Sequence, residues 1–227
     1  GYGLTEAPIV SANNYKNQKV KIGTVGIPLN CLNVTIGSDG EILVKGSNVM
    51  MGYYKDEMKT NEVLKNGIFH TGDKGEIDAQ GFVKITGRKK EIFKTSGGKY
   101  IAPSAIEGLL KESRFIEQAM VIGDGEKMPA AIIQPHFEFL LAWAKRKKID
   151  FDGSNEGVIQ HKKVLKRLQK EIDKVNEKLG KWEQVKAFEL TSEVWGVENN
   201  LLTPTLKMKR KVILQNYEHL YIKIYRN

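Results

Sequence analysis

The sequence predicts an α+β fold in which a β-rich first part is followed by an α+β second part. Between about residues 20 and 86, short apolar runs alternate with Gly and Asp turns, as in β-hairpins. After residue 103, apolar residues recur at helical spacing, which indicates amphipathic helices around a few strands. The pattern changes within TGRKKEIFKTSGGKY (86–100), so we divide the chain into domains at 1–87 and 88–227.

Two hairpins are expected in the first part. The segments NVTIGSDGEILVKG (33–46) and EIDAQGFVKITG (76–87) each read as a strand, a tight turn and a second strand. In the second part, Pro103 opens a helix, because proline is favoured in the first turn. The segments QAMVIGDG (118–125) and PAAIIQP (129–135) are then expected to form two strands of a small sheet.

Two longer apolar patterns predict further helices in the second part. In each pattern the apolar residues recur on one helical face, and charged residues fill the other. The two sets are Val158, Leu165, Leu168, Ile172, Val175 and Leu179, and then Val212, Ile213, Tyr217, Leu220, Tyr221 and Ile224. We expect the second set to form one terminal helix that packs on the second domain.

Composition limits the class of protein. A formal charge of +9 favours anionic partners, namely nucleotides, phosphorylated cofactors, nucleic acid or acidic lipid headgroups. A single cysteine, Cys31, excludes an internal disulfide framework and a zinc knuckle, so a reducing, cytoplasmic location is expected. No apolar run approaches the roughly 18 residues that a membrane span needs. The chain begins with Gly and opens directly on a motif, so we expect a piece of a longer protein.

The first heptapeptide, GYGLTEA, carries three groups suited to a nucleotide. Tyr2 offers an aromatic face for a base, Thr5 a hydroxyl for a phosphate, and Glu6 a carboxylate for magnesium. The alternative is a loop entering a helix, with Thr5 as the cap and Glu6 favouring the helix dipole. Further along, Asp73 lies between glycines and is suited to the two hydroxyls of a ribose, or else is a hairpin-turn residue.

The basic stretch between the domains contains two kinds of charge. Arg88 makes forked contacts with ribose or phosphate, whereas Lys90 and its neighbouring lysines act as point charges. Gly97 and Gly98 then bring main-chain N–H groups close to a narrow ligand or a phosphate, with Lys99 beside them. The GxxxxGK[ST] spacing of a P-loop is absent. The alternative is an exposed basic loop between domains.

Lys207 is the last candidate. Pro204 prevents an early helix and holds this lysine on a loop just before the predicted terminal helix. The alternative is that Lys207 is one of several basic residues that decorate the start of that helix.

Five motifs in this order resemble the adenylate-forming superfamily of acyl-CoA synthetases, luciferases and adenylation domains. They are YGLTE (2–6), GEILVKGSNVMMGYY (40–54), TGD (71–73), GRKKEIFKTSGGKYIAPSAIE (87–107) and PTLKMKR (204–210). Within the superfamily, KTSGGKYIAP, LTPTLKMKR and the helical segment 136–182 are most similar to long-chain fatty acid–CoA ligases. Leu206 departs from the pattern, because many relatives have Gly before the lysine. The family's upstream phosphate loop and most of its acyl pocket are absent from this chain.

The resemblance implies the C-terminal part of an enzyme that joins a carboxylate to ATP and then passes the acyl group to coenzyme A. The first domain would be a β-rich remnant, a distorted barrel or hairpins, of the large adenylation domain, and the second a mobile lid with a hinge near residues 88–90. By resemblance, the nucleotide-binding residues are Tyr2, Thr5, Asp73 and Arg88, Glu6 holds Mg²⁺, and Lys207 is catalytic; Lys90 is the hinge, and Gly97, Gly98 and Lys99 serve coenzyme A or phosphate. The implied partners are a fatty acid or other carboxylate, ATP or AMP, and coenzyme A, with no nucleic acid.

Three alternatives stay open. A basic nucleic-acid-binding module fits the pI of about 9.4 but lacks a recognisable binding motif. An adenylate-forming ligase for another acyl substrate, or a fragment that folds without performing chemistry, fits the same motifs. We expect the isolated chain to be inactive. Basic helices and aromatics near the C-terminus also permit peripheral contact with an anionic membrane.

Overall fold

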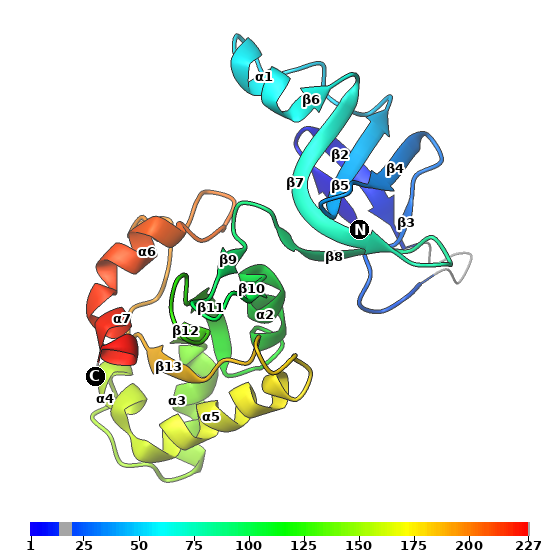
Figure 1. Ribbon diagram of the computed structural model, residues 1–227. Helices are drawn as coiled ribbons and strands as arrows, with labels where there is room; N and C mark the ends of the chain where they lie inside the picture. The colour runs from blue at the N-terminus through cyan, green and yellow to red at the C-terminus, as the bar shows by residue number, and fades with distance from the viewer. Residues whose placement is uncertain (14–19, 227) are drawn as a thin grey trace. The chain divides into compact units, whose positions relative to one another are not determined.

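The computed structural model describes residues 1–13 and 20–226. The chain forms two compact units, Gly1–Glu91 and Ile92–Asn227, called unit 1 and unit 2 below. The division between them lies four residues beyond the sequence-based boundary at 87/88. The α+β class predicted from the sequence is confirmed, because strands dominate unit 1 whereas unit 2 combines strands and helices (Figure 1).

Unit 1 contains two small antiparallel sheets. The first has the order β1-β2-β3; in the second, the order is β4-β5-β7-β6, and β8 also pairs with β7. The strands are β1 (Tyr2–Leu4), β2 (Ala7–Ala12), β3 (Ile27–Pro28), β4 (Leu32–Ile36), β5 (Glu41–Gly46), β6 (Leu64–Lys65), β7 (Ile68–Ile77) and β8 (Val83–Arg88). Both predicted hairpins are therefore present, as β4–β5 and β7–β8.

The unit has a core of its own. Alternate residues of the second sheet, including Ile42, Val44 and Phe69, pack with Ala7 and Val10 of β2. Helix α1 (Glu57–Val63) was not predicted from the sequence and contributes no fully buried residue. Its start is fixed by Asp56, whose carboxylate accepts a hydrogen bond from the backbone N–H of Lys59.

Unit 2 surrounds a three-stranded sheet with the order β11-β12-β13. The strands of unit 2 are β9 (Phe93–Lys94), β10 (Tyr100–Ile101), β11 (Ile116–Ile122), β12 (Ala130–Pro135) and β13 (Ala187–Leu190). β9 and β10 form a separate two-stranded sheet. Its helices are α2 (Pro103–Leu110), α3 (Phe137–Arg146), α4 (Asn155–Gln160), α5 (Lys162–Asn176), α6 (Arg210–Asn216) and α7 (Glu218–Tyr225). The two predicted strands are present as β11 and β12 and pair in an antiparallel way, whereas β13, which was not predicted, runs parallel to β12.

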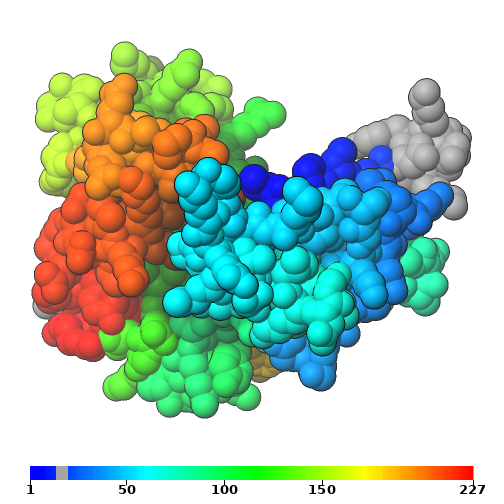
Figure 2. All heavy atoms as spheres, turned by 90° about the horizontal axis from the view of Figure 1, so that it is seen from above, coloured from blue at the N-terminus to red at the C-terminus, as the bar shows by residue number. Residues whose placement is uncertain are grey.

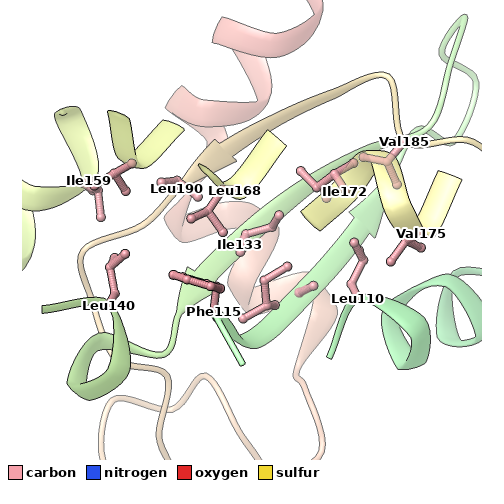
Figure 3. Packing of buried hydrophobic residues seen from close by; sticks show 14 of the residues in the cluster. Leu110, Phe115, Ile133, Leu140, Ile159, Leu168, Ile172, Val175, Val185 and Leu190 are labelled. Atoms are coloured by element: carbon pink, nitrogen blue, oxygen red, sulfur yellow. The ribbon is translucent and has the colours of Figure 1, made fainter. Parts of the chain in front are cut away.

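Both faces of this sheet are buried, because successive strand residues point to opposite sides. Val121 and Ile133 face helices α2 to α5, where they join a cluster that contains Leu168 and Ile172 (Figure 3). Met120 and Ile132 face the other way and pack with residues of α6 and α7. Strands buried on both sides read as continuous apolar runs, which is why QAMVIGDG and PAAIIQP show no alternation. In Figure 2 the C-terminal segment, orange to red, covers a continuous surface of unit 2.

Two helical predictions need correction. The predicted helix from Val158 to Leu179 is interrupted at His161. This residue ends α4, and its ring nitrogen caps the start of α5. Val164, not the more exposed Leu165, lies in the core. The terminal pattern is likewise split, because the backbone leaves helical geometry at Tyr217 between α6 and α7. The predicted packing of this terminal segment on unit 2 is present. Within residues 1–13 and 20–226, no helix has the length and apolar character to cross a bilayer.

Candidate functional site

The carboxylate of Asp73 is the centre of the candidate site in unit 1. Its Oδ2 accepts a 2.7 Å hydrogen bond from the Tyr2 hydroxyl, and its Oδ1 accepts a 2.7 Å bond from Nε of Arg88. The side chain of Asp73 is only 7% exposed, whereas Arg88 is partly open to solvent. Three residues that the sequence nominated separately are therefore joined in one network.

Strand pairing places these groups together. Asp73 lies within β7, directly opposite Arg88 in β8, so the alternative of a hairpin-turn residue is wrong. Gly72 precedes it with a φ of 72°, a left-handed conformation that favours glycine. The Asp73 N–H donates to the Thr71 hydroxyl at 3.1 Å, and this hydroxyl donates to the carbonyl of Ile42 at 2.8 Å. The TGD segment is therefore held by the neighbouring strand.

The electrostatics of this network keep the Tyr2 hydroxyl protonated beside the carboxylate of Asp73. Burial raises the pKa of the Tyr2 hydroxyl, and its hydrogen bond to Asp73 raises it further. The same carboxylate raises the pKa of Arg88, so the guanidinium stays charged. A carboxylate has about four lone-pair sites, and a guanidinium has five N–H donors. Asp73 and Arg88 can therefore hydrogen-bond to each other and still have acceptors and donors left for the two hydroxyls of a vicinal diol.

Glu41 is a functional candidate that the sequence reasoning passed over, although it lies in the quoted GEILVKG motif. The buried carboxylate accepts hydrogen bonds from the Gly72 N–H at 2.8 Å and from Nζ of Lys89 at 3.2 Å. It also lies 3.2 Å from Nδ1 of His70. Burial alone would raise the pKa of Glu41, but these partners together hold it below its usual value. Lys89 also pairs with Asp39 at 2.7 Å, and its backbone N–H donates to the carbonyl of Gly72 at 2.8 Å, so this residue holds the TGD segment directly.

Thr5 and Glu6 occupy the turn between β1 and β2, so the alternative in which they start a helix is wrong. Glu6 Oε1 accepts a 2.7 Å hydrogen bond from the hydroxyl of Tyr53, which belongs to the Gly-Tyr turn and was not nominated from the sequence. Burial and this carboxylate raise the pKa of Tyr53 to about 12, so Tyr53 remains a donor.

The single carboxylate of Glu6 fits a magnesium ion that is coordinated mainly by water and by the phosphates of a bound nucleotide. Mg²⁺ in nucleotide sites usually takes one or two carboxylates, several waters and phosphate oxygens. Glu6 is one such carboxylate. Across residues 1–13 and 20–226 no cluster of three or more His, Cys, Asp or Glu could form an all-protein cage.

The glycine loop of unit 2 is the tip of the β9–β10 hairpin. The Thr95 N–H donates to the Lys99 carbonyl at 2.9 Å, and the Gly98 N–H donates to the Thr95 carbonyl at 2.8 Å. Gly98 has a φ of 78°, which favours glycine at this position. Gly97, Gly98 and Lys99 are exposed, and the Lys99 ammonium lies 5.6 Å from the ring centroid of Trp182.

Lys207 lies on a tight loop that follows Pro204 and ends before α6. The Thr203 N–H donates to the Lys207 carbonyl at 2.8 Å, and the Lys207 N–H donates to the Thr203 hydroxyl at 3.0 Å. Leu206, where many relatives have Gly, adopts a φ of 58° and is exposed. Lys207 is also exposed and lies on the loop just before α6, three residues ahead of the first helical residue, Arg210.

The loop is anchored behind Lys207 by an ion pair that the sequence did not reveal. Arg210, the first residue of α6, donates from Nη2 to the buried Glu107 of α2 at 2.5 Å. The other oxygen of Glu107 accepts a 2.7 Å hydrogen bond from the Val121 N–H in β11. Glu107 therefore ties the start of α6 to the sheet. Its only signal in the sequence is its place at the end of the PSAIE segment.

The predicted site residues thus form two groups, one in each unit. Unit 1 brings together Tyr2, Asp73 and Arg88, and holds Glu6 through Tyr53. Unit 2 carries the glycine loop and the lysine loop. Lys90 is exposed in a turn closed by the Glu91 N–H and the Arg88 carbonyl at 3.0 Å, one residue before the division between units.

Comparison with known proteins places these motifs in a family. Residues 90–227 match the family model of the AMP-binding enzyme C-terminal domain. The chain is 38% identical over 232 aligned residues to the human long-chain-fatty-acid–CoA ligase 1, covering 96% of this chain and 33% of the relative. It is 35% identical over 217 residues to the long-chain-fatty-acid–CoA ligase FadD15 of Mycobacterium bovis, covering 96% and 36%. The chain therefore spans about a third of the length of these relatives.

A solved structure supports the fold. The O-succinylbenzoate coenzyme A synthetase of Bacillus subtilis, in complex with ATP and a magnesium ion, superposes with a TM-score of 0.66 and 24% identity. The match covers 92% of this chain and 40% of that chain. The resemblance to adenylate-forming enzymes is confirmed, and the chain belongs to the family of AMP-binding enzyme C-terminal domains.

Proposed function

We propose that the protein to which this chain belongs is an ATP-dependent long-chain fatty acyl-CoA synthetase. It joins a fatty acid to ATP with release of pyrophosphate, then exchanges AMP for coenzyme A. The observation that carries this proposal is the network of Tyr2, Asp73 and Arg88, a buried carboxylate and a guanidinium arranged for a ribose. The identity to fatty acid ligases supports the acyl substrate.

In this proposal unit 1 binds the nucleotide. Asp73 accepts hydrogen bonds from the ribose hydroxyls while Arg88 donates to them, and the Tyr2 ring stacks on adenine. Thr5 contacts the α-phosphate, and Glu6 is oriented for magnesium by its bond to Tyr53. Bound magnesium supplies charge neutralisation at the phosphate oxygens.

Lys207 is the proposed catalytic residue for adenylation. Negative charge accumulates on the α-phosphate and the leaving pyrophosphate as the acyl carboxylate attacks, so a positioned ammonium lowers the barrier. Unit 2 holds Lys207 on a short loop fixed at both ends, by Thr203 on one side and by the Glu107–Arg210 pair on the other. The loop limits the positions that the ammonium can adopt.

For the second half-reaction, the proposed roles pass to the glycine loop and the hinge. Gly97 and Gly98 lack side chains and so line a narrow path for the pantetheine of coenzyme A, while Lys99 contacts phosphate. Lys90 lies beside the division between units and is the proposed hinge.

We keep the cytoplasm as the proposed compartment because the one cysteine, Cys31, is an exposed free thiol. Peripheral membrane contact stays part of the proposal.

AMP release by the full-length protein tests the proposal. The assay contains ATP, magnesium, coenzyme A and carboxylates from acetate to long-chain fatty acids. We expect release that depends on a long acyl chain, and no release by the isolated 227-residue chain. Release with another class of acid only would favour a non-fatty acyl substrate. A folded full-length protein that no acid stimulates would remove the proposed activity.

Replacing Lys90 with proline tests the hinge. Proline fixes φ and disfavours the α region in the preceding residue, so it should block changes in the Arg88–Glu91 turn. We expect near-normal pyrophosphate release but at least ~10-fold slower thioester formation, since a rotation of the lid gates only the second step. Lys90→Ala is the matched control and should leave both steps intact. An unchanged overall rate for Lys90→Pro would remove the hinge assignment.

A further inference from the structure

We propose that Glu126 is a positioning residue that ties the glycine loop to the C-terminal end of the chain. This inference rests on the proposed function of the glycine loop in thioester formation. The end of α7 would then fix the backbone that coenzyme A contacts. Neither the motifs nor the family resemblance gave Glu126 or the end of α7 a role.

The first link is between two backbone segments. The Ser96 N–H, in the glycine loop, donates to the carbonyl of Glu126 at 2.9 Å. In the reverse direction, the Gly125 N–H donates to the carbonyl of Lys94 at 2.9 Å. These two bonds join the β9–β10 hairpin to the β11–β12 connection just before Gly97 and Gly98. The backbone around Glu126 is therefore bonded directly to the glycine loop.

The second link is between side chains of the same connection and the C-terminal helix. The Glu126 carboxylate accepts hydrogen bonds from Nη2 and Nη1 of Arg226, at 2.5 and 3.1 Å. It also accepts a bond from the Tyr221 hydroxyl at 2.5 Å. A forked guanidinium contact fixes direction as well as distance. Both oxygens of Glu126 are thereby held, by Tyr221 within α7 and by Arg226, the residue that directly follows α7.

The base of the same connection is fixed separately. The Tyr225 hydroxyl is within hydrogen-bond distance of the carbonyls of Ile122 and Met128, at 3.2 and 3.0 Å, so it bridges the two ends of the β11–β12 connection. Gly123 has a φ of 138°, and a Cβ added there would lie 3.1 Å from that hydroxyl. Tyr225 therefore holds the root of the connection, and Arg226 with Tyr221 holds its tip.

The charge state of the tip favours a persistent contact. The Arg226 guanidinium, followed by the Tyr221 hydroxyl, holds the pKa of Glu126 below its usual range, so the carboxylate is ionised at neutral pH. The Glu126 side chain is 12% exposed, whereas that of Arg226 is 56% exposed. An exposed arginine can be replaced without opening the core, which makes it the better position for a test.

The experiment replaces Arg226 with glutamine in the full-length protein. Lys223→Gln is the matched control, because Lys223 lies three residues before Arg226 in the last turn of α7, is 58% exposed, and pairs with Glu189 of β13 at 2.8 Å. Arg226→Lys, which keeps the charge and loses the fork, is the rescue variant. Hydrogen exchange is followed by mass spectrometry in peptides that contain Ser96 and Gly125, and pyrophosphate exchange and thioester formation are measured separately.

We expect faster exchange at both peptides in Arg226→Gln but not in Lys223→Gln. The KM for coenzyme A should rise about fivefold, as for the loss of one exposed ion pair, with adenylation within twofold of the parent. Arg226→Lys should lie between the two. Exchange unchanged in Arg226→Gln would overturn the link, and so would equal losses in both half-reactions. If the parent protein activates no acid, the proposed function fails, yet hydrogen exchange still decides whether Arg226 holds the loop.

Discussion

Replacing Lys207 with alanine in the full-length protein is expected to slow adenylation by roughly 100- to 1,000-fold, the usual loss when one preorganised transition-state contact is removed. The reason is that the ammonium stabilises charge that develops only as pyrophosphate leaves. Thioester formation from supplied acyl-adenylate should change little, because that charge is no longer present. ATP-dependent pyrophosphate release and thioester formation from acyl-adenylate are measured as two separate rates.

Lys211→Ala provides the control for this experiment. Lys211 is an exposed lysine in the first turn of α6, close in sequence to Lys207 but beyond the loop. Its removal changes the net charge equally, so a general electrostatic effect would appear in both variants. Equal loss of both half-reactions in Lys207→Ala would contradict its assigned role and indicate damage to unit 2.

Replacing Glu107 with alanine is expected to lower the free energy of unfolding of unit 2 by about 1.5–3 kcal/mol, the usual cost of losing a hydrogen bond to a charged group in a largely buried position. The substitution leaves the guanidinium of Arg210 without its carboxylate and removes the acceptor of the Val121 N–H. Urea unfolding of this chain, followed by tryptophan fluorescence, measures the loss. Trp143, Trp182 and Trp195 all lie in unit 2, so the signal reports that unit alone.

Glu112→Ala is the matched control for the stability measurement. Glu112 follows α2 and pairs with Lys178 at 3.1 Å, but both side chains are more than half exposed. An exposed pair of this kind contributes about 0–1 kcal/mol. Similar losses for the two variants would mean that Glu107 contributes no more than a surface charge, and the anchoring of the lysine loop through Arg210 would fall with it.

The sequence predicted the elements whose causes are local. The β4–β5 and β7–β8 hairpins were found because Gly40 and Gly81 lie in their turns with positive φ, and turn chemistry is readable over a few residues. Helix α1 was missed because it is short and buries nothing, so no apolar period marks it. The break at His161 was missed because the apolar spacing continues across it, while the capping bond of the histidine ring does not show in a spacing.

The same distinction holds for the candidate site. Residue types nominated Tyr2, Asp73 and Arg88 one by one, but the hydrogen bond from Tyr2 to Asp73 joins strands 71 residues apart and depends on how the two sheets pack. Glu41 and Glu107 were passed over because a buried carboxylate looks like any surface glutamate until its partners are known. The roles assigned by resemblance remain predictions, whereas the contacts that hold these residues follow from the fold.

The parallel pairing of β12 with β13 has a consequence for how unit 2 acquires its structure. Three helices, α3 to α5, separate the two strands in the chain, so their pairing requires closure of a loop of that length. Closing so long a loop has a large entropic cost that only later contacts offset, and such non-local pairing is slow. The antiparallel β11–β12 pair, by contrast, needs only a short turn. During synthesis, the edge of β12 that pairs with β13 would therefore keep its backbone groups unpaired until β13 has left the ribosome.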